Sequence, residues 1–177
     1  IRIVDEDDNP VANGVMGEIV VRGPQVMKGY WNKPEATAEA IRDGWMHTGD
    51  AGTLDDEGYL YIQDRIKDMI VSGGENVYPG MVEKVLFKHP AIADAAVIGV
   101  PDEQWGETVK AVVVLGDEKS VSEDEVIDFC RDQMGGFQRP RSVDFIEEIP
   151  RNSSGKVLKR ELREPYWVGH GRRVAGS

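Results

Sequence analysis

The sequence of 177 residues contains a single cysteine, Cys130, and therefore no second thiol with which it could pair. An intramolecular disulfide and a cluster of thiolate metal ligands are both excluded, and a reducing, cytoplasmic setting is expected. No apolar run approaches the roughly 20 residues needed to span a bilayer, and no signal peptide is visible, so no integral membrane segment is predicted. The three histidines are scattered without ligand spacing, and we predict no metal site.

Basic residues are also in short supply. The chain has 21 Lys and Arg against 32 Asp and Glu, a formal net charge of −11, which argues against nucleic acid or an anionic membrane as a partner. The balance reverses locally, because residues 139–173 contain 9 basic and 5 acidic side chains. A cationic end on an acidic protein suits a polyanionic small ligand, although a solvated basic tail is the simpler explanation.

The first third of the chain is expected to be mostly β. It has no initiator Met and opens inside a strand-like run, so we interpret it as a piece of a longer protein. Strands are predicted at residues 1–4 and 18–21, and a short helix from Pro34 to Ile41 that Gly44 closes. A hairpin should follow, with its turn at 55–58 and its return strand at 59–62. This part contains no complete core of its own.

The rest of the chain predicts a compact α+β module of roughly a hundred residues. Its helices are expected at 79–89, with Met81 on the buried face, and from a capping box at Ser122 to the glycines at 135–136. Its strands are expected at 92–100, as a central strand, at 108–115 and at 143–146. The fold class is therefore α+β, with a short sheet flanked by helices. The chain from Pro165 onward is predicted to be a loose tail.

Residues 64–79 (DRIKDMIVSGGENVYP) are the segment around which the chain is organised. Four of the first five residues are charged, and a short buried strand is expected at 69–71. Gly73 and Gly74 then allow a turn and the close approach of another backbone or a ligand. Pro79 opens the helix. On these features alone, a surface loop, a core strand and a turn form the simpler interpretation.

Four segments, taken together, resemble the acyl-adenylate-forming enzymes in their order and spacing. They are residues 17–23 (GEIVVRG) followed by 29–31 (GYW), residues 44–50 (GWMHTGD), residues 64–79, and residues 150–156 (PRNSSGK). The resemblance covers residues 1–165. It implies that residues 1–64 end the large N-terminal adenylation domain, in its β-rich subdomain. Residues 65–165 would then form the mobile C-terminal domain, and residues 166–177 a tail.

The resemblance implies the C-terminal part of an ATP-dependent acyl-CoA ligase. Such an enzyme uses ATP with Mg²⁺ to convert a carboxylic acid to acyl-AMP, and CoA then displaces AMP. The segments at 72–79 and 154–159 look more like those of fatty-acid or aryl-acid CoA ligases than those of peptide-synthetase domains. Two alternatives stay open: an adenylation domain that loads a carrier protein, and a non-catalytic module that binds nucleotide or a partner. The family's phosphate loop and acyl pocket lie upstream of Ile1, so the acid is not indicated. The missing N-terminal domain is the expected partner.

The resemblance also assigns nucleotide-binding residues. Asp50 is similar to the aspartate that binds both ribose hydroxyls, and a carboxylate accepts two such hydrogen bonds. Arg65 resembles the arginine that also reaches the ribose, and Ile62 the residue that lines the adenine–ribose pocket. Each has a simpler explanation: a turn aspartate, a surface ion pair of Arg65 with Asp64 or Asp68, and a core isoleucine.

The remaining assignments concern catalysis and movement. Lys156 matches the family's catalytic lysine, which offsets the charge of an anionic carboxylate approaching an anionic phosphate. Its simpler explanation is a surface lysine, and a P-loop is rejected because Pro150 stands in place of the first glycine. Lys67 matches the hinge residue about which the small domain rotates. Gly73 and Gly74 match the CoA-binding segment, where Gly74 lets the pantetheine arm pass.

Overall fold

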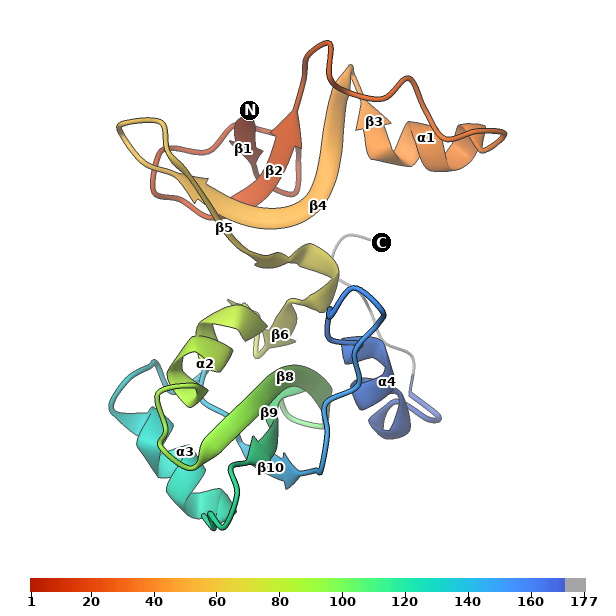
Figure 1. Ribbon diagram of the computed structural model, residues 1–177. Coiled ribbons are helices and arrows are strands. Elements are labelled where there is room, and N and C mark those ends of the chain that lie inside the picture. The colour runs from red at the N-terminus through yellow and green to blue at the C-terminus, as the bar shows by residue number, and fades with distance from the viewer. Residues whose placement is uncertain (171–177) are drawn as a thin grey trace. The chain divides into compact units, whose positions relative to one another are not determined.

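The computed structural model describes residues 1–170, which form two compact units (Figure 1). The first is Ile1–Lys67, and the second begins at Asp68. Both contain strands and helices, so the predicted α+β class is confirmed. Within the described residues, no helix is both long enough and apolar enough to cross a bilayer.

The first unit is a five-stranded sheet in which every pair is antiparallel. Its strands are β1 (Arg2–Val4), β2 (Gly17–Val21), β3 (Ile41–Arg42), β4 (Trp45–Leu54) and β5 (Leu60–Arg65). The long strand β4 pairs with β2, β3 and β5, and the turn at 55–58 joins it to β5 as the sequence predicted. All the pairing in this sheet except β1 with β2 therefore depends on β4.

The core of the first unit is small. Its buried apolar side chains are Ile3, Val4, Ile19, Val20 and Ala51. The helix α1 (Pro34–Ala40) buries no residue and ends before Ile41, which begins β3. Gly44 was expected to close this helix, but the helix ends before it. Gly44 follows Asp43 in the turn between β3 and β4, where both residues have positive φ (49° and 79°). That combination suits a tight two-residue hairpin turn.

The second unit is a mixed sheet covered on both faces. Its strands are β6 (Ile70–Ser72), β7 (Glu75–Val77), β8 (Ile92–Asp102), β9 (Gly106–Leu115) and β10 (Ser142–Phe145). Its helices are α2 (Pro79–Leu86), α3 (Glu123–Arg131), the short α4 (Lys159–Arg163), and the 3-10 turns η1 (Ile66–Asp68, at the boundary) and η2 (Glu164–Tyr166). Strand β9 is central: it pairs antiparallel with β8 and β6 and parallel with β10.

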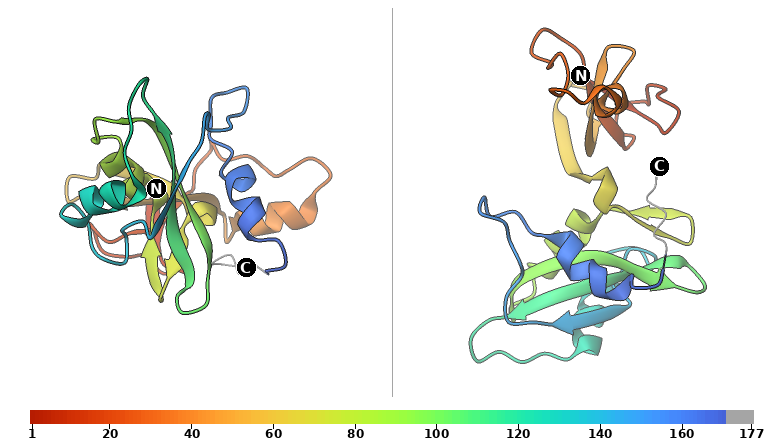
Figure 2. Two further views of the ribbon diagram at one scale, coloured as in Figure 1. Left: turned by 90° about the horizontal axis from the view of Figure 1, so that it is seen from below. Right: turned by 90° about the vertical axis from the view of Figure 1, so that its right-hand side faces the viewer.

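Alternate residues of the sheet contribute to two apolar clusters. Val97, Ala111 and Val113 pack with α2 and α3, whereas Ile98 and Val112 pack with Leu162 and its neighbours in α4 and η2. The left view of Figure 2 shows the sheet between these two sets of helices. Because both faces are covered, β8 and β9 are continuous apolar runs rather than alternating ones.

The prediction that β8 is a central strand is wrong, because within the described residues it pairs only with β9. Its free edge is covered instead by a side chain. Glu83 of α2 accepts a hydrogen bond from the backbone N–H of Val97 (2.8 Å) and pairs with Lys159 of α4 (2.8 Å). An unpaired strand edge is a site for aggregation, and this arrangement blocks it.

Two helix predictions need correction. Met81 is 40% exposed and lies off the buried face of α2, which ends at Leu86 rather than at 89. The capping box of α3 is confirmed, with reciprocal hydrogen bonds between Ser122 and Glu125. The helix nevertheless ends at Arg131, before the glycines at 135–136. The apolar period continues to Met134, which packs against the core from outside the helix.

The expectation of a loose tail from Pro165 is wrong as far as residue 170. Tyr166 donates a hydrogen bond to Asp144, which also pairs with Lys110 (2.6 Å). Burial, together with this hydrogen bond, raises the pKa of Tyr166 to about 12. The Trp167 indole donates to the carbonyl of Gly99 (3.0 Å). The rest of the predicted tail, residues 171–177, lies outside the described residues.

Candidate functional site

Asp50 and Arg65 lie opposite each other on β4 and β5. The Arg65 Nε donates to Asp50 Oδ1 at 3.0 Å, and both side chains are partly exposed. Arg65 thus has an ion pair, but with Asp50 rather than with Asp64 or Asp68. Among the described residues, no hydrogen bond or ion pair engages Oδ2 of Asp50, so this oxygen can still accept a hydrogen bond from a ligand.

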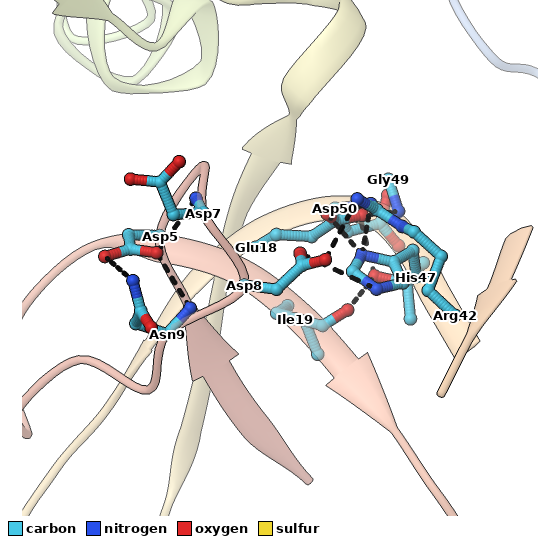
Figure 3. Close-up of polar contacts among 11 residues, drawn as sticks. Asp5, Asp7, Asp8, Asn9, Glu18, Ile19, Arg42, His47, Gly49 and Asp50 are labelled. Atoms are coloured by element: carbon cyan, nitrogen blue, oxygen red, sulfur yellow. Dashed lines mark hydrogen bonds and ion pairs between the residues drawn. The ribbon is translucent and has the colours of Figure 1, made fainter. Parts of the chain in front are cut away.

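Asp50 stands in an irregular part of β4 rather than in a simple turn. Gly49 before it has a φ of 70°, and the pairing of β4 with both neighbours shifts register near this point. Figure 3 shows that side chains from three elements meet around this segment: Glu18 of β2, Arg42 of β3 and His47 of β4. None of these three was given a functional role from the sequence.

Ile62 is 63% exposed on β5, so it is not a core residue. Tyr59 and Tyr61 on the same hairpin are also exposed. An apolar side chain exposed three residues before Arg65 is available to contact a ligand held by Asp50 and Arg65.

Lys67 lies in η1, between two ion pairs that each belong to one unit. Arg65 is paired with Asp50 in the first unit, and Asp68 is paired with Arg163 of α4 (3.3 Å) in the second. Only Ile66 and Lys67 lie between the two anchored residues. The segment between the two ion pairs is therefore very short.

Gly73 and Gly74 form the two-residue turn between β6 and β7. Strand β7 was not predicted from the sequence. Both glycines have positive φ (62° and 86°), the combination that a type I′ hairpin turn requires. A Cβ on Gly73 would lie 2.5 Å from the Trp105 ring, whereas a Cβ on Gly74 would have no neighbour within 4 Å. Gly73 is thus enclosed by the protein, and Gly74 faces open space.

Lys156 is exposed at the end of a closed loop between β10 and α4. The backbones of Asn152 and Lys156 are joined by an N–H···O bond of 2.9 Å, and the Asn152 side chain accepts from the N–H groups of Ser154 and Lys156. Gly155 takes a φ of 81° within this turn. Among the described residues, no hydrogen bond or ion pair engages the Lys156 ammonium, so its charge is free for a ligand.

The Lys156 loop is fixed to the sheet by Arg151. Its guanidinium contacts both oxygens of Asp94 on β8 (2.9 and 2.7 Å) and also donates to the carbonyl of Gly155 (3.0 Å). Both contacts to Asp94 are made by Nη2, whereas Nη1 makes the contact to Gly155. One side chain therefore joins the strand to the residue directly before Lys156.

Within the second unit, the Lys156 loop and the Gly73–Gly74 turn are far apart. Both views of Figure 2 place the blue loop before α4 and the yellow-green hairpin of β6 and β7 at opposite ends of the unit. Asp50 and Arg65 come together in the first unit, whereas Lys156 and Gly74 are two separate features of the second.

Comparison with known proteins identifies the family of the chain. Residues 81–156 match the family described as AMP-binding enzyme C-terminal domain, and residues 1–31 match the AMP-binding enzyme family. These matches together cover more than half of the chain, on both sides of the boundary at Lys67. The chain belongs to the acyl-adenylate-forming, AMP-binding enzymes.

The relatives it matches are much longer. It is 50% identical to a feruloyl-CoA synthase of Amycolatopsis over 94% of this chain and 34% of that protein. It is 49% identical to the long-chain-fatty-acid–CoA ligase FadD13 of Mycobacterium tuberculosis over 90% of this chain and 32% of that protein. The crystal structure of ATP-bound MatB from Rhodopseudomonas palustris is 41% identical, with a TM-score of 0.89, over 93% of this chain and 33% of that chain. The chain thus spans about a third of each relative.

Proposed function

We propose that this chain is part of an ATP-dependent acyl-CoA ligase. In the first half-reaction, a carboxylate oxygen attacks the α-phosphorus of ATP, giving acyl-AMP and pyrophosphate. In the second, the CoA thiol attacks the acyl carbonyl and AMP leaves, giving the thioester. The observation that supports this most strongly is the exposed Asp50–Arg65 pair, placed by β4 and β5 in a chain about half identical to named CoA ligases.

The nucleotide is assigned to the first unit. Asp50 accepts hydrogen bonds from the ribose hydroxyls, Arg65 orients the carboxylate, and Ile62 offers apolar surface to the adenosine. Mg²⁺ is expected to arrive bound to the ATP phosphates, and the described residues contain no group of three or more His, Cys, Asp or Glu that could hold a metal.

The second unit supplies groups to both half-reactions. Lys156 offsets negative charge as the carboxylate approaches the phosphate. Lys67 is the hinge, and Gly74, with Gly73 before it, lets the pantetheine arm of CoA reach the acyl-AMP. The separation of Lys156 from Gly74 within one unit supports this division, because a unit that turns can present each end in succession.

The acid and the acceptor are inferred only as classes. Named relatives act on an aryl acid and on long-chain fatty acids, and we propose an acid of one of these two classes, activated in the cytoplasm. The rest of a chain of the relatives' length is the expected partner of these residues. Release of AMP that depends on CoA supports the ligase, whereas release that depends on a carrier protein with a free pantetheine thiol would support carrier loading instead.

The first prediction tests this function. A protein of the relatives' length that contains this chain should exchange labelled pyrophosphate into ATP when its acid is present, and should form acyl-CoA when CoA is added. The 177 residues alone should do neither, because they span about a third of each relative. Pyrophosphate exchange by the 177-residue chain above the level of its Lys156→Ala variant would contradict this assignment. A protein of the relatives' length that binds nucleotide but does not exchange pyrophosphate would also contradict it.

The second prediction concerns the anchor of the Lys156 loop. Arg151→Ala should lower the rate of acyl-AMP formation about tenfold, because small displacements of a catalytic group reduce rates strongly. Acyl-CoA formation from supplied acyl-AMP should be unchanged. Asp94→Ala removes the other partner and should have the same effect.

Arg131→Ala provides the matched control for this anchor. It removes an exposed ion pair with Asp128 on α3, in the same unit but away from the loop. Exposed pairs of this kind contribute only about 0–1 kcal/mol to stability, so all three variants should fold. Equal rates for Arg151→Ala and Arg131→Ala in pyrophosphate exchange would show that the anchor does not position Lys156.

A further inference from the structure

The segment that carries Asp50 is a bulge in β4. Strand β2 advances two residues, from Glu18 to Val20, while β4 covers four, from Ala51 to His47. The extra residues include Gly49, whose φ of 70° is open to glycine at little strain. A bulge leaves backbone groups outside the ladder, and these need other partners when water is limited.

Two side chains take the place of the missing ladder bonds. Glu18 Oε1 accepts from the N–H of Gly49 at 3.0 Å, and Thr48 Oγ1 accepts from the N–H of Asp50 at 3.1 Å. The Thr48 hydroxyl in turn donates to the carbonyl of Ile19 on β2 (2.7 Å). The backbone N–H groups of Gly49 and Asp50 are therefore both held by β2, the first directly by Glu18 and the second through Thr48.

Glu18 is itself held in place by charge. Its side chain is only 17% exposed, and its second oxygen, Oε2, lies 2.8 Å from Nδ1 of His47, whose side chain is 7% exposed. Arg42 Nη2 lies 3.7 Å from the same oxygen and also contacts Asp8 through Nη1 (3.1 Å). His47 Nδ1 lies close to Arg42 as well (2.7 Å), but one ring nitrogen cannot donate to Glu18 and accept from Arg42 at once. With the proton on Nδ1, the ring donates to Glu18, whose charge Arg42 also faces.

We propose that Glu18, oriented by His47 and Arg42, is a positioning residue for nucleotide binding. It sets the bulge so that the Asp50 carboxylate faces Arg65 and can receive both ribose hydroxyls. Glu18 does not touch the nucleotide in this scheme. It acts through the backbone of Gly49, so its loss weakens recognition of the ribose rather than of the phosphates or the acid. The inference rests on the proposed function of Asp50.

The test is discrimination between ATP and 2′-deoxy-ATP in pyrophosphate exchange, measured as the ratio of their kcat/KM values in the full-length enzyme. Asp50→Ala gives the ratio that remains without the carboxylate. We expect this variant to lower the ratio about tenfold or more, because it removes a charged hydrogen bond to the ribose. Glu18→Ala should lower the ratio about fivefold, mainly by reducing kcat/KM for ATP. Glu18→Gln should stay within about twofold of the wild type, because its amide oxygen can still accept from Gly49.

Asp55→Ala is the matched control. Asp55 Oδ1 accepts from the N–H groups of Glu57 (3.0 Å) and Tyr59 (2.8 Å) in the same unit, at the turn between β4 and β5. Asp55→Ala therefore removes a comparable set of carboxylate–backbone bonds without removing a partner of Glu18, and it should leave ribose discrimination unchanged. A structural effect alone would lower thermal stability in both variants without changing the ratio.

Glu18→Asp keeps the inference testable if Glu18→Ala does not fold. It retains the negative charge beside His47 and Arg42 but withdraws the oxygen from Gly49 by one methylene, so it should lower the ratio as Glu18→Ala does. Wild-type discrimination in a folded Glu18→Ala or Glu18→Asp variant would overturn the positioning role. Absence of pyrophosphate exchange in the wild-type enzyme would instead overturn the proposed function.

Discussion

Replacing Lys156 with alanine is expected to slow the formation of acyl-AMP by a factor of about 10²–10³ or more, the usual effect of losing one preorganised charge-stabilising donor. The same variant should make acyl-CoA from supplied acyl-AMP at nearly the wild-type rate. The reason is electrostatic. Two anionic groups, a carboxylate and a phosphate, must approach each other in the first half-reaction only, and Lys156 is an exposed cation without a protein partner among the described residues.

A structural role for the Lys156 side chain can be distinguished from a catalytic one. The loop is closed by the backbone and by Asn152, and its anchor is Arg151, so the ammonium is not needed to hold it. Lys119→Ala, which removes another exposed lysine of the same unit, provides the control for net charge. Equal slowing of both half-reactions in Lys156→Ala would show that the lysine is structural and that the two half-reactions do not use different ends of the unit.

Under the proposed division of labour, the second unit must change its orientation between the two half-reactions. The Asp50–Arg65 pair ties the chain to the first unit, and the Asp68–Arg163 pair ties it to the second. Ile66 and Lys67 are left between these anchors, which supports Lys67 as the hinge. Arg163 belongs to α4, the helix that follows the Lys156 loop, so this helix connects the proposed hinge with that loop.

Features with a local signal were predictable from the sequence, and features that depend on strand pairing were not. The capping box at Ser122 and the turn at 55–58 are encoded within four residues each, and both are present. The central strand was misassigned, because the apolar run of β8 reports burial on two faces but not its place in the sheet. The docking of Trp167 on Gly99 joins residues 68 positions apart and leaves no local pattern.

The candidate site shows the same division. Asp50, Arg65 and Lys156 were proposed individually by resemblance, whereas the pairing of Asp50 with Arg65 follows from the register of β4 with β5. Glu18 lies 31 residues from Gly49 and 29 from His47, and only the pairing of β2 with β4 brings them together. Its segment was recognised as part of the family pattern, yet nothing in its immediate neighbourhood indicates a bond to a bulged backbone.

Gly74→Leu should have the opposite effect to Lys156→Ala. We expect acyl-AMP formation close to the wild-type rate and loss of most acyl-CoA formation from supplied acyl-AMP. A Cβ on Gly74 would meet no protein atom within 4 Å, so a leucine side chain would extend into space that the pantetheine arm is proposed to use. Gly73 is a poorer choice for this test, because a side chain there would collide with Trp105 and disturb the fold first.

The turn itself offers a competing explanation, because both positions of a type I′ turn favour glycine whatever the ligand does. Gly58 separates the two effects. It has a φ of 85° against 86° for Gly74, it also has no neighbour within 4 Å of a Cβ, and it lies in the hairpin between β4 and β5. Gly58→Leu therefore introduces the same backbone strain, on the order of 1–2 kcal/mol, without a side chain near the Gly73–Gly74 turn. If strain alone were responsible, the two variants would lose thermal stability and thioester formation together. If Gly74 is the passage for the thiol, both should be destabilised alike, and only Gly74→Leu should fail to transfer the acyl group to CoA.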